Sequence, residues 1–119
     1  MKDFRDLNVW KESHALALAV YRASLTFLRE ELYTLTSQLR RAAGSIPANI
    51  SEGCGRGGDP EFGRFLQVAM GSASELEYHL LLAYDLHYLS EEAFNGLTCS
   101  AVEVKRMLAA LLGKVKADR

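Results

Sequence analysis

The sequence contains little cysteine and little histidine, the residues that build disulfide scaffolds and most transition-metal sites. Its 119 residues include two cysteines and three histidines. Cys54 and Cys99 lie far apart, with no CxxC pair and no histidine at ligand spacing. A di-iron bundle needs two Glu-x-x-His pairs, whereas the chain offers a single Glu-x-x-x-His, from Glu75 to His79. We therefore expect two thiols in a reducing compartment, with no metal and no other cofactor.

The chain also lacks an excess of charge of one sign and any long apolar run. Its formal net charge is −1, whereas domains that bind polyanions indiscriminately have isoelectric points above about 9. Any contact with nucleic acid must therefore come from a local basic patch. No apolar run approaches the roughly 18 residues of a membrane span, and the first residues, MKDFRDLNVW, contain no apolar signal-peptide region. We expect a cytoplasmic protein with no membrane partner.

What the sequence does contain is apolar residues at steps of three and four, the spacing of one face of an α-helix. The pattern covers four segments, 8–29, 35–52, 60–86 and 91–115. In the first segment it places Tyr21, Leu25 and Leu28 on the core face. Short polar connections separate the segments, and no strand pattern occurs. The sequence predicts an all-α fold, a single antiparallel up-down-up-down four-helix bundle over residues 1–119.

Glycine is concentrated at residues 53–58, GCGRGG, between the second and third predicted helices. Glycines before a helix can cradle a phosphate, but this segment follows a helix rather than a strand and lacks the Lys-Ser/Thr of a P-loop. Asp59 would also stand where the phosphate binds. We interpret the segment as a chain reversal. Arg56 can lower the pKa of the nearby Cys54 thiol, but no histidine lies close in the sequence, so we expect no enzymatic activity.

A line of polar residues follows one flank of the second predicted helix at steps of three and four. One interpretation is a hydrogen-bonded network along the bundle, in which Arg41 pairs with an acid. The other is a contact surface for RNA, with arginines that meet phosphates or stack on bases. The polar line consists of Gln38, Arg41, Ser45, Asn49 and Glu52. The arginines of the RNA interpretation are Arg40, Arg41, Arg56 and Arg64.

Pro47 interrupts the second helical pattern. Within a helix it cannot bond to the Ala43 carbonyl and clashes with it, at a cost of roughly 3 kcal/mol. Ile46 and Ile50 stay in phase across the proline, so we expect a kink rather than a break. Asn49 or a neighbouring arginine would supply a donor to the freed carbonyl.

Four stretches in consistent order resemble the S23 family, four-helix bundles encoded in 23S rRNA intervening sequences. They are FRDLNVWKESHALALAVY, LTSQLRRAAGSIPANISEGCGR, FGRFLQVAMGSASELEYHL and VKRMLAALL. The block SQ-RRA--SI--NI-EG--R is a fairly specific signature of that family. The chain departs from the family pattern at Leu28 and Thr34, where proline and glycine are frequent, and at His87, which replaces a helix-ending glycine.

The resemblance implies a homopentameric ring. A related branch, the accessory protein of diversity-generating retroelements, also forms a pentamer and binds RNA and a reverse transcriptase through positive surface. The implied partners are therefore further copies of this chain and either RNA or an RNA-processing or reverse-transcribing protein. The resemblance supports testing five positions, which are Arg40, Arg41, Asn49, Glu52 and Arg56.

The third predicted helix is apolar on more than one side, which favours an interface between copies. The residues concerned are Phe65, Leu66, Val68, Ala69 and Met70. The sequence thus predicts a non-enzymatic oligomeric bundle that binds structured RNA through the second helix and the glycine segment. One alternative is a scaffold for a protein partner. Another is a small-ligand pocket at subunit boundaries, lined by Trp10, Arg41 and Asn49.

Overall fold

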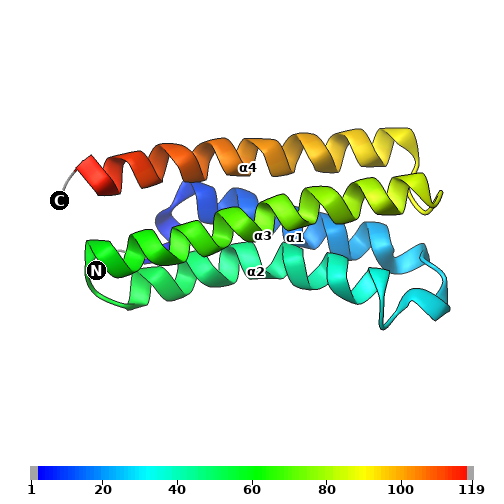
Figure 1. Ribbon diagram of the computed structural model, residues 1–119, viewed down its shortest axis with the longest axis horizontal. Helices are drawn as coiled ribbons and strands as arrows, with labels where there is room; N and C mark the ends of the chain where they lie inside the picture. Colours follow the sequence, from blue (N-terminus) through cyan, green and yellow to red (C-terminus); the bar gives the residue numbers. More distant parts are fainter. Residues whose placement is uncertain (1–2, 118–119) are drawn as a thin grey trace.

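The computed structural model describes residues 3–117 and confirms an all-helical four-helix bundle. Helices α1 (Asn8–Ala23), α2 (Leu35–Gly55), α3 (Asp59–Asp85) and α4 (Glu91–Ala117) follow one another in alternating directions (Figure 1). The bundle is elongated, with principal extents of 46 × 23 × 20 Å. No strand occurs within residues 3–117, and no helix there is both long and apolar enough to cross a membrane.

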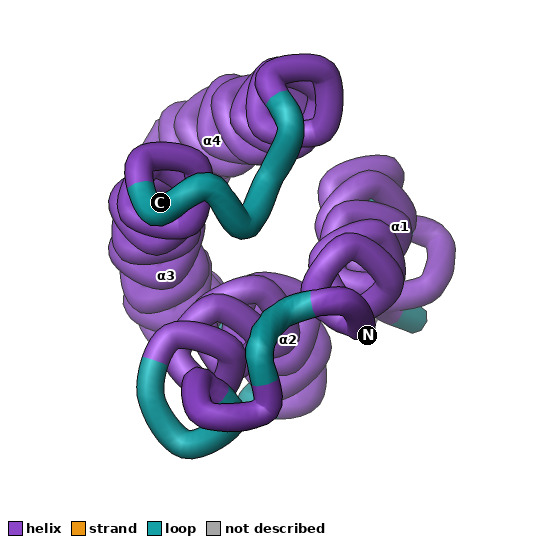
Figure 2. Tube along the Cα trace, turned by 90° about the vertical axis from the view of Figure 1, so that its right-hand side faces the viewer, coloured by secondary structure: helices purple, strands orange, loops and turns teal. Residues whose placement is uncertain are grey.

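The core lies between the helices and is built from the apolar faces that the sequence pattern predicts for α2 and α4. Viewed along the bundle, α3 lies between α2 and α4, and α1 lies beside α2 (Figure 2). Burying a leucine or isoleucine side chain contributes roughly 1.5–3 kcal/mol, so these side chains hold the four helices together. The largest fully buried ones include Leu39, Ile46, Ile50, Leu66, Leu76, Leu80 and Leu108.

The first helix is shorter than predicted, because α1 ends at Ala23 rather than at residue 29. The chain continues in two 3-10 turns, η2 (Ser24–Thr26) and η3 (Arg29–Glu31). Phe27 has an extended backbone between them, is buried, and stacks on Tyr88 with ring centroids 5.1 Å apart. This tertiary contact outweighs the helical pattern. Leu25, which the pattern placed on the core face, is therefore 74% exposed.

The other two residues named from the predicted core face of segment 8–29 are also exposed, so the prediction is wrong for them. The buried residues of α1 are Val9, Ser13, Leu16, Ala17 and Val20. Tyr21 is 48% exposed and Leu28 is 55% exposed. Tyr21 lies in the last turn of α1, and Leu25 and Leu28 lie in the connection between α1 and α2, at one end of the bundle. Apolar and aromatic surface is thus concentrated where the helical pattern predicted burial.

The reversal between α2 and α3 is shorter than the predicted segment 53–58. Gly53 and Cys54 belong to α2 and are buried, so Cys54 does not lie in a flexible loop. A Cβ at Gly53 would lie 2.9 Å from the Cβ of Phe65 on α3, and this glycine therefore permits close packing of the two helices. Gly57 and Gly58, with φ of 68° and 140°, make the actual turn.

Most of the apolar residues that suggested a second apolar side on the third helix are packed within the bundle. Phe65, Leu66 and Ala69 are buried, and Met70 is half-buried against the core. Of the five residues, Val68 alone is classed as exposed, at 44%. The third helix therefore gives weaker support for an interface between copies than its sequence suggested.

Candidate nucleic-acid interface

The centre of the polar line is a network between helices. Asn49 Nδ2 on α2 donates to the Ser45 carbonyl oxygen at 2.7 Å and to the Ser45 hydroxyl at 2.9 Å. The Ser45 hydroxyl in turn shares a hydrogen bond of 2.8 Å with the hydroxyl of Ser72 on α3. These half-buried groups join the two helices, as the structural interpretation of the polar line predicts.

Asn49 does not take the role expected of it beside Pro47. Its amide is bonded to Ser45 rather than to the Ala43 carbonyl that Pro47 leaves without its helical donor. α2 nevertheless runs as one helix from Leu35 to Gly55. The chain therefore passes the proline without a break in the helix.

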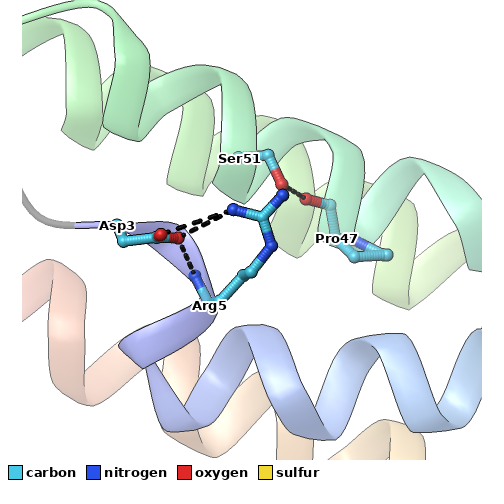
Figure 3. A network of polar contacts seen from close by, with 4 residues as sticks. All are labelled: Asp3, Arg5, Pro47 and Ser51. Carbon is cyan, nitrogen blue, oxygen red and sulfur yellow. Dashed lines mark hydrogen bonds and ion pairs between the residues drawn. The ribbon is translucent and has the colours of Figure 1, made fainter.

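Beside Pro47, the 3-10 turn that precedes α1 contacts α2. Arg5 lies in η1 (Phe4–Asp6) and is bonded to the Asp3 carboxylate through its backbone nitrogen at 2.9 Å and through Nη1 at 3.2 and 3.3 Å. Its guanidinium points toward Pro47 and Ser51 (Figure 3). The Ser51 hydroxyl donates to the Pro47 carbonyl oxygen at 2.8 Å. Arg5 is therefore paired with Asp3, and Ser51 with Pro47, where η1 contacts α2.

Arg40 and Arg41 are both bonded to neutral partners. The Nε of half-buried Arg40 donates to the Ser24 hydroxyl at 2.8 Å, and its guanidinium carbon lies 5.1 Å from the centre of the Tyr21 ring. Exposed Arg41 donates from Nη2 to the Gln38 side-chain oxygen. The acid that the structural interpretation expected for Arg41 is replaced by this amide. Both guanidinium charges therefore remain without a carboxylate in these contacts.

Arg56 and Arg64 differ, since each is paired with a carboxylate. Arg56 lies 2.7 Å from the Glu52 oxygen and Arg64 lies 3.1 Å from the Glu61 oxygen. The hydrogen bond from Arg64 lowers the pKa of the Glu61 carboxyl and raises the pKa of Arg64. Both guanidinium groups also lie against the Phe65 ring, at 5.4 Å and 4.5 Å. Such exposed pairs add little stability, but they reduce the positive charge offered to another molecule.

The four predicted arginines do not form one patch. Arg40 and Arg56 are separated by about 24 Å along the α2 axis, given a rise of about 1.5 Å per residue. The α1–α2 connection and the α2–α3 turn lie at opposite ends of the bundle (Figure 1). The structure therefore brings Arg40 and Arg41 together at one end, and Arg56 and Arg64 at the other.

A hollow of about 530 Å³ opens beside Arg40 and Arg41. A smaller hollow of about 220 Å³ adjoins it, and the two share Leu32, Thr36 and Arg40. Tyr33 lies at the rim with 89% of its surface exposed. The larger hollow is lined by Tyr21, Leu32, Tyr33, Thr36, Ser37, Arg40 and Arg41.

Sequence analysis missed Tyr33, which stands in the connection before α2 and fits no helical pattern. The signal that was available is the position of Tyr33 a few residues before Arg40 and Arg41, since aromatic and basic residues together are typical of nucleic-acid surfaces. The opposite end of α2 has a hollow of about 490 Å³ at Arg56, but its lining contains no aromatic residue. Stacking and positive charge therefore coincide at the Arg40 end.

Trp10 lies away from this hollow. It stacks on His14 at 4.8 Å and meets Phe4 edge to face at 5.0 Å, near the start of α1. Neither hollow at Arg40 is lined by Trp10 or Asn49. Of Trp10, Arg41 and Asn49, the residues of the small-ligand alternative, Arg41 alone lines one of the two hollows at Arg40 within a single chain. No group of His, Cys, Asp and Glu side chains that could hold a metal ion occurs among residues 3–117.

Fold and site together define a small all-α protein, a four-helix bundle with an aromatic and basic hollow at one end. The chain belongs to the family of 23S rRNA-intervening sequence proteins, whose model matches residues 5–110. This confirms the family resemblance seen in the sequence. The family description indicates no catalytic activity.

One solved structure that resembles this bundle is a protein of unknown function from the S23 ribosomal protein family of Bacteroides thetaiotaomicron VPI-5482. It is 23% identical in sequence, and the match covers 87% of this chain and 97% of that chain, with a TM-score of 0.78. At this identity the likeness supports the fold alone. Comparison with curated proteins found no match.

Proposed function

We propose that this protein is a cytoplasmic homopentamer that binds structured RNA through Arg40 and Arg41. One observation carries the proposal: both guanidinium groups are held by neutral partners beside a hollow with two exposed tyrosines. Phosphates supply most of the affinity in nucleic-acid binding, and uncompensated guanidinium groups are the side chains that contact them most effectively. Arg56 and Arg64 would contribute less, because Glu52 and Glu61 already pair with them.

A pentamer would make a weak site useful. With a net charge of −1, a single chain has no general attraction for RNA. Five copies of one patch on a ring would bind one RNA at several points, so that modest affinities combine. The family is named for where its members are encoded, so the name identifies no ligand.

The test is fluorescence anisotropy with a labelled structured RNA, titrated at several salt concentrations. We expect log-linear weakening with salt, since each phosphate contact releases counterions. Replacing both residues, Arg40→Ala with Arg41→Ala, should weaken binding roughly tenfold at low salt and reduce the salt slope by about two.

The matched control is Arg56→Ala with Arg64→Ala, which removes the same charge from the opposite end of the bundle, at the α2–α3 turn. It should change the affinity and the slope much less. Equal effects of the two double variants would contradict the assignment to Arg40 and Arg41. Absence of binding at low salt would contradict RNA binding altogether.

The second candidate function is a scaffold for a protein partner, such as an RNA-processing or reverse-transcribing protein. It is favoured by the exposed leucines of the α1–α2 connection, Leu25 at 74% and Leu28 at 55%. Apolar contacts of that kind would persist at high salt, whereas phosphate contacts would not. The salt titration therefore separates the two functions.

A further inference from the structure

We propose that the hollow beside Arg40 and Arg41 holds one unpaired nucleotide of the bound RNA, with its base stacked on Tyr33. The inference rests on the proposed RNA-binding function and names the structural element of the RNA that this site recognises. It comes from two features of the hollow: an exposed aromatic ring, and two guanidinium groups that are bonded to a serine hydroxyl and a glutamine amide rather than to a carboxylate.

Tyr33 is the ring available for stacking. The ring of Tyr21 faces the Arg40 guanidinium at 5.1 Å, so part of its surface is already covered. Tyr33 is 89% exposed on the short connection between η3 and α2. An aromatic ring offers an unpaired base a stacking surface, and such stacking tolerates any base because each has a flat π face.

Arg40 and Arg41 supply the charge for the phosphate of the same nucleotide. They line the hollow together with Tyr33, and the carboxylate nearest in the chain, Glu31, has its oxygens bonded elsewhere. One oxygen accepts from the Thr34 hydroxyl at 2.5 Å and the other accepts from the Tyr88 hydroxyl at 3.0 Å. Base stacking and phosphate contact can therefore occur side by side.

Thr36 is a lining residue whose hydroxyl oxygen is covered by protein atoms. The residue is 3% exposed, and this oxygen has no hydrogen-bond partner among residues 3–117. Thr36 lines both the larger and the smaller hollow. Buried hydroxyls are normally satisfied, but this oxygen is covered, so the hollow offers a base the ring of Tyr33 and the charge of the arginines rather than a contact with the hydroxyl.

A paired base cannot use this site. In an RNA duplex, both faces of a base are covered by the neighbouring bases. Proteins recognise RNA sequence mainly where bases are unstacked, in loops and bulges. The volume of about 530 Å³ lies within the range of small-molecule sites, roughly 300–1,000 Å³. The geometry therefore favours a bulge or loop nucleotide over a duplex.

The experiment compares two labelled RNA hairpins of equal charge, one fully paired and one with a single unpaired 2-aminopurine. We expect about tenfold tighter binding of the bulged hairpin, with quenching of its fluorescence as the base stacks. Tyr33→Leu should abolish both the preference and the quenching, while binding of the paired hairpin stays unchanged. Thr36→Val should leave the preference unchanged, because the hydroxyl oxygen is covered by protein atoms.

Tyr78→Leu is the matched control, because Tyr78 is a tyrosine exposed to 58% on α3, outside both hollows. Equal affinity for the two hairpins, or a Tyr33→Leu variant that keeps the preference, would overturn this inference and leave RNA binding through Arg40 and Arg41 standing. Failure to bind either hairpin at low salt would overturn both proposals.

Discussion

At the scale of single residues, His87 carries a backbone conformation that L-amino acids avoid. Its φ is 68°, and it follows the last residues of α3. The Tyr88 amide donates to the Ala83 carbonyl at 2.9 Å and the His87 amide donates to the Tyr84 carbonyl at 2.9 Å, which together form a Schellman end. This is the position where the sequence resemblance expects glycine, and the structure shows why: a Cβ is strained there.

We predict that His87→Gly raises the free energy of unfolding by about 1 kcal/mol, because glycine adopts positive φ without strain. The melting temperature should rise by several degrees, about 4 °C per kcal/mol for a chain of this size. Thermal unfolding followed by circular dichroism measures both. His87→Ala keeps the Cβ and should give little change; a gain as large as that of glycine would contradict the argument.

At the scale of elements, the packing of α2 against α3 depends on Gly53. The nearest atoms to a Cβ at this position are the Phe65 Cβ at 2.9 Å and the Phe62 Cδ1 at 3.0 Å. The Phe65 Cβ is bonded directly to the α3 backbone, so no side-chain rotation moves it away. The two helices are therefore in contact at a point where only glycine fits, close to the turn that connects them.

We predict that Gly53→Ala lowers the free energy of unfolding by about 1–3 kcal/mol, the usual cost of overpacking a core. Gly44→Ala in the same helix is the matched control, because nothing lies within 4 Å of its Cβ. That variant should be stabilising by about 0.5–1 kcal/mol through helix propensity. Denaturant unfolding of both variants checks the opposite signs; destabilisation by both would show that packing at Gly53 is not the cause.

At the scale of the whole molecule, charge is balanced overall but uneven along the bundle. Arg56 and Arg64 are paired with Glu52 and Glu61 at one end, whereas Arg40 and Arg41 at the other end are bonded to Ser24 and Gln38. Aromatic and apolar surface is concentrated at the Arg40 end as well, where Leu25 and Tyr33 are exposed. One end of the elongated bundle therefore has the chemistry for a partner, and repetition in a ring would multiply it.

We predict a particle of pentamer mass in light scattering, with the mass unchanged between low and high salt, since apolar interfaces are little affected by screening. Arg40→Ala with Arg41→Ala should leave the assembly intact. A monomer at all concentrations would contradict the ring. Dissociation of the double variant would instead show that these arginines stabilise the assembly.

The sequence by itself determined what depends on neighbours in the chain. Steps of three and four place apolar residues on one face of a helix, so the four helices and the buried faces of α2 and α4 could be predicted. So could the reversal near Gly57 and the polar line that contains Ser45 and Asn49, whereas the helix-end position of His87 was implied by the family resemblance. The helices, the reversal and the polar line follow from local geometry, which the sequence expresses directly.

Only the tertiary structure decided what depends on residues far apart. α1 ends at Ala23 because Phe27 packs on Tyr88, some sixty residues away by sequence, and no periodicity records that contact. Arg40 and Arg56 look alike in the sequence, yet the fold gives one a serine and a tyrosine ring and the other a glutamate. The hollow at Tyr33 exists only once α1, the connection and α2 are packed, because burial and pairing are set by the fold rather than by residue type.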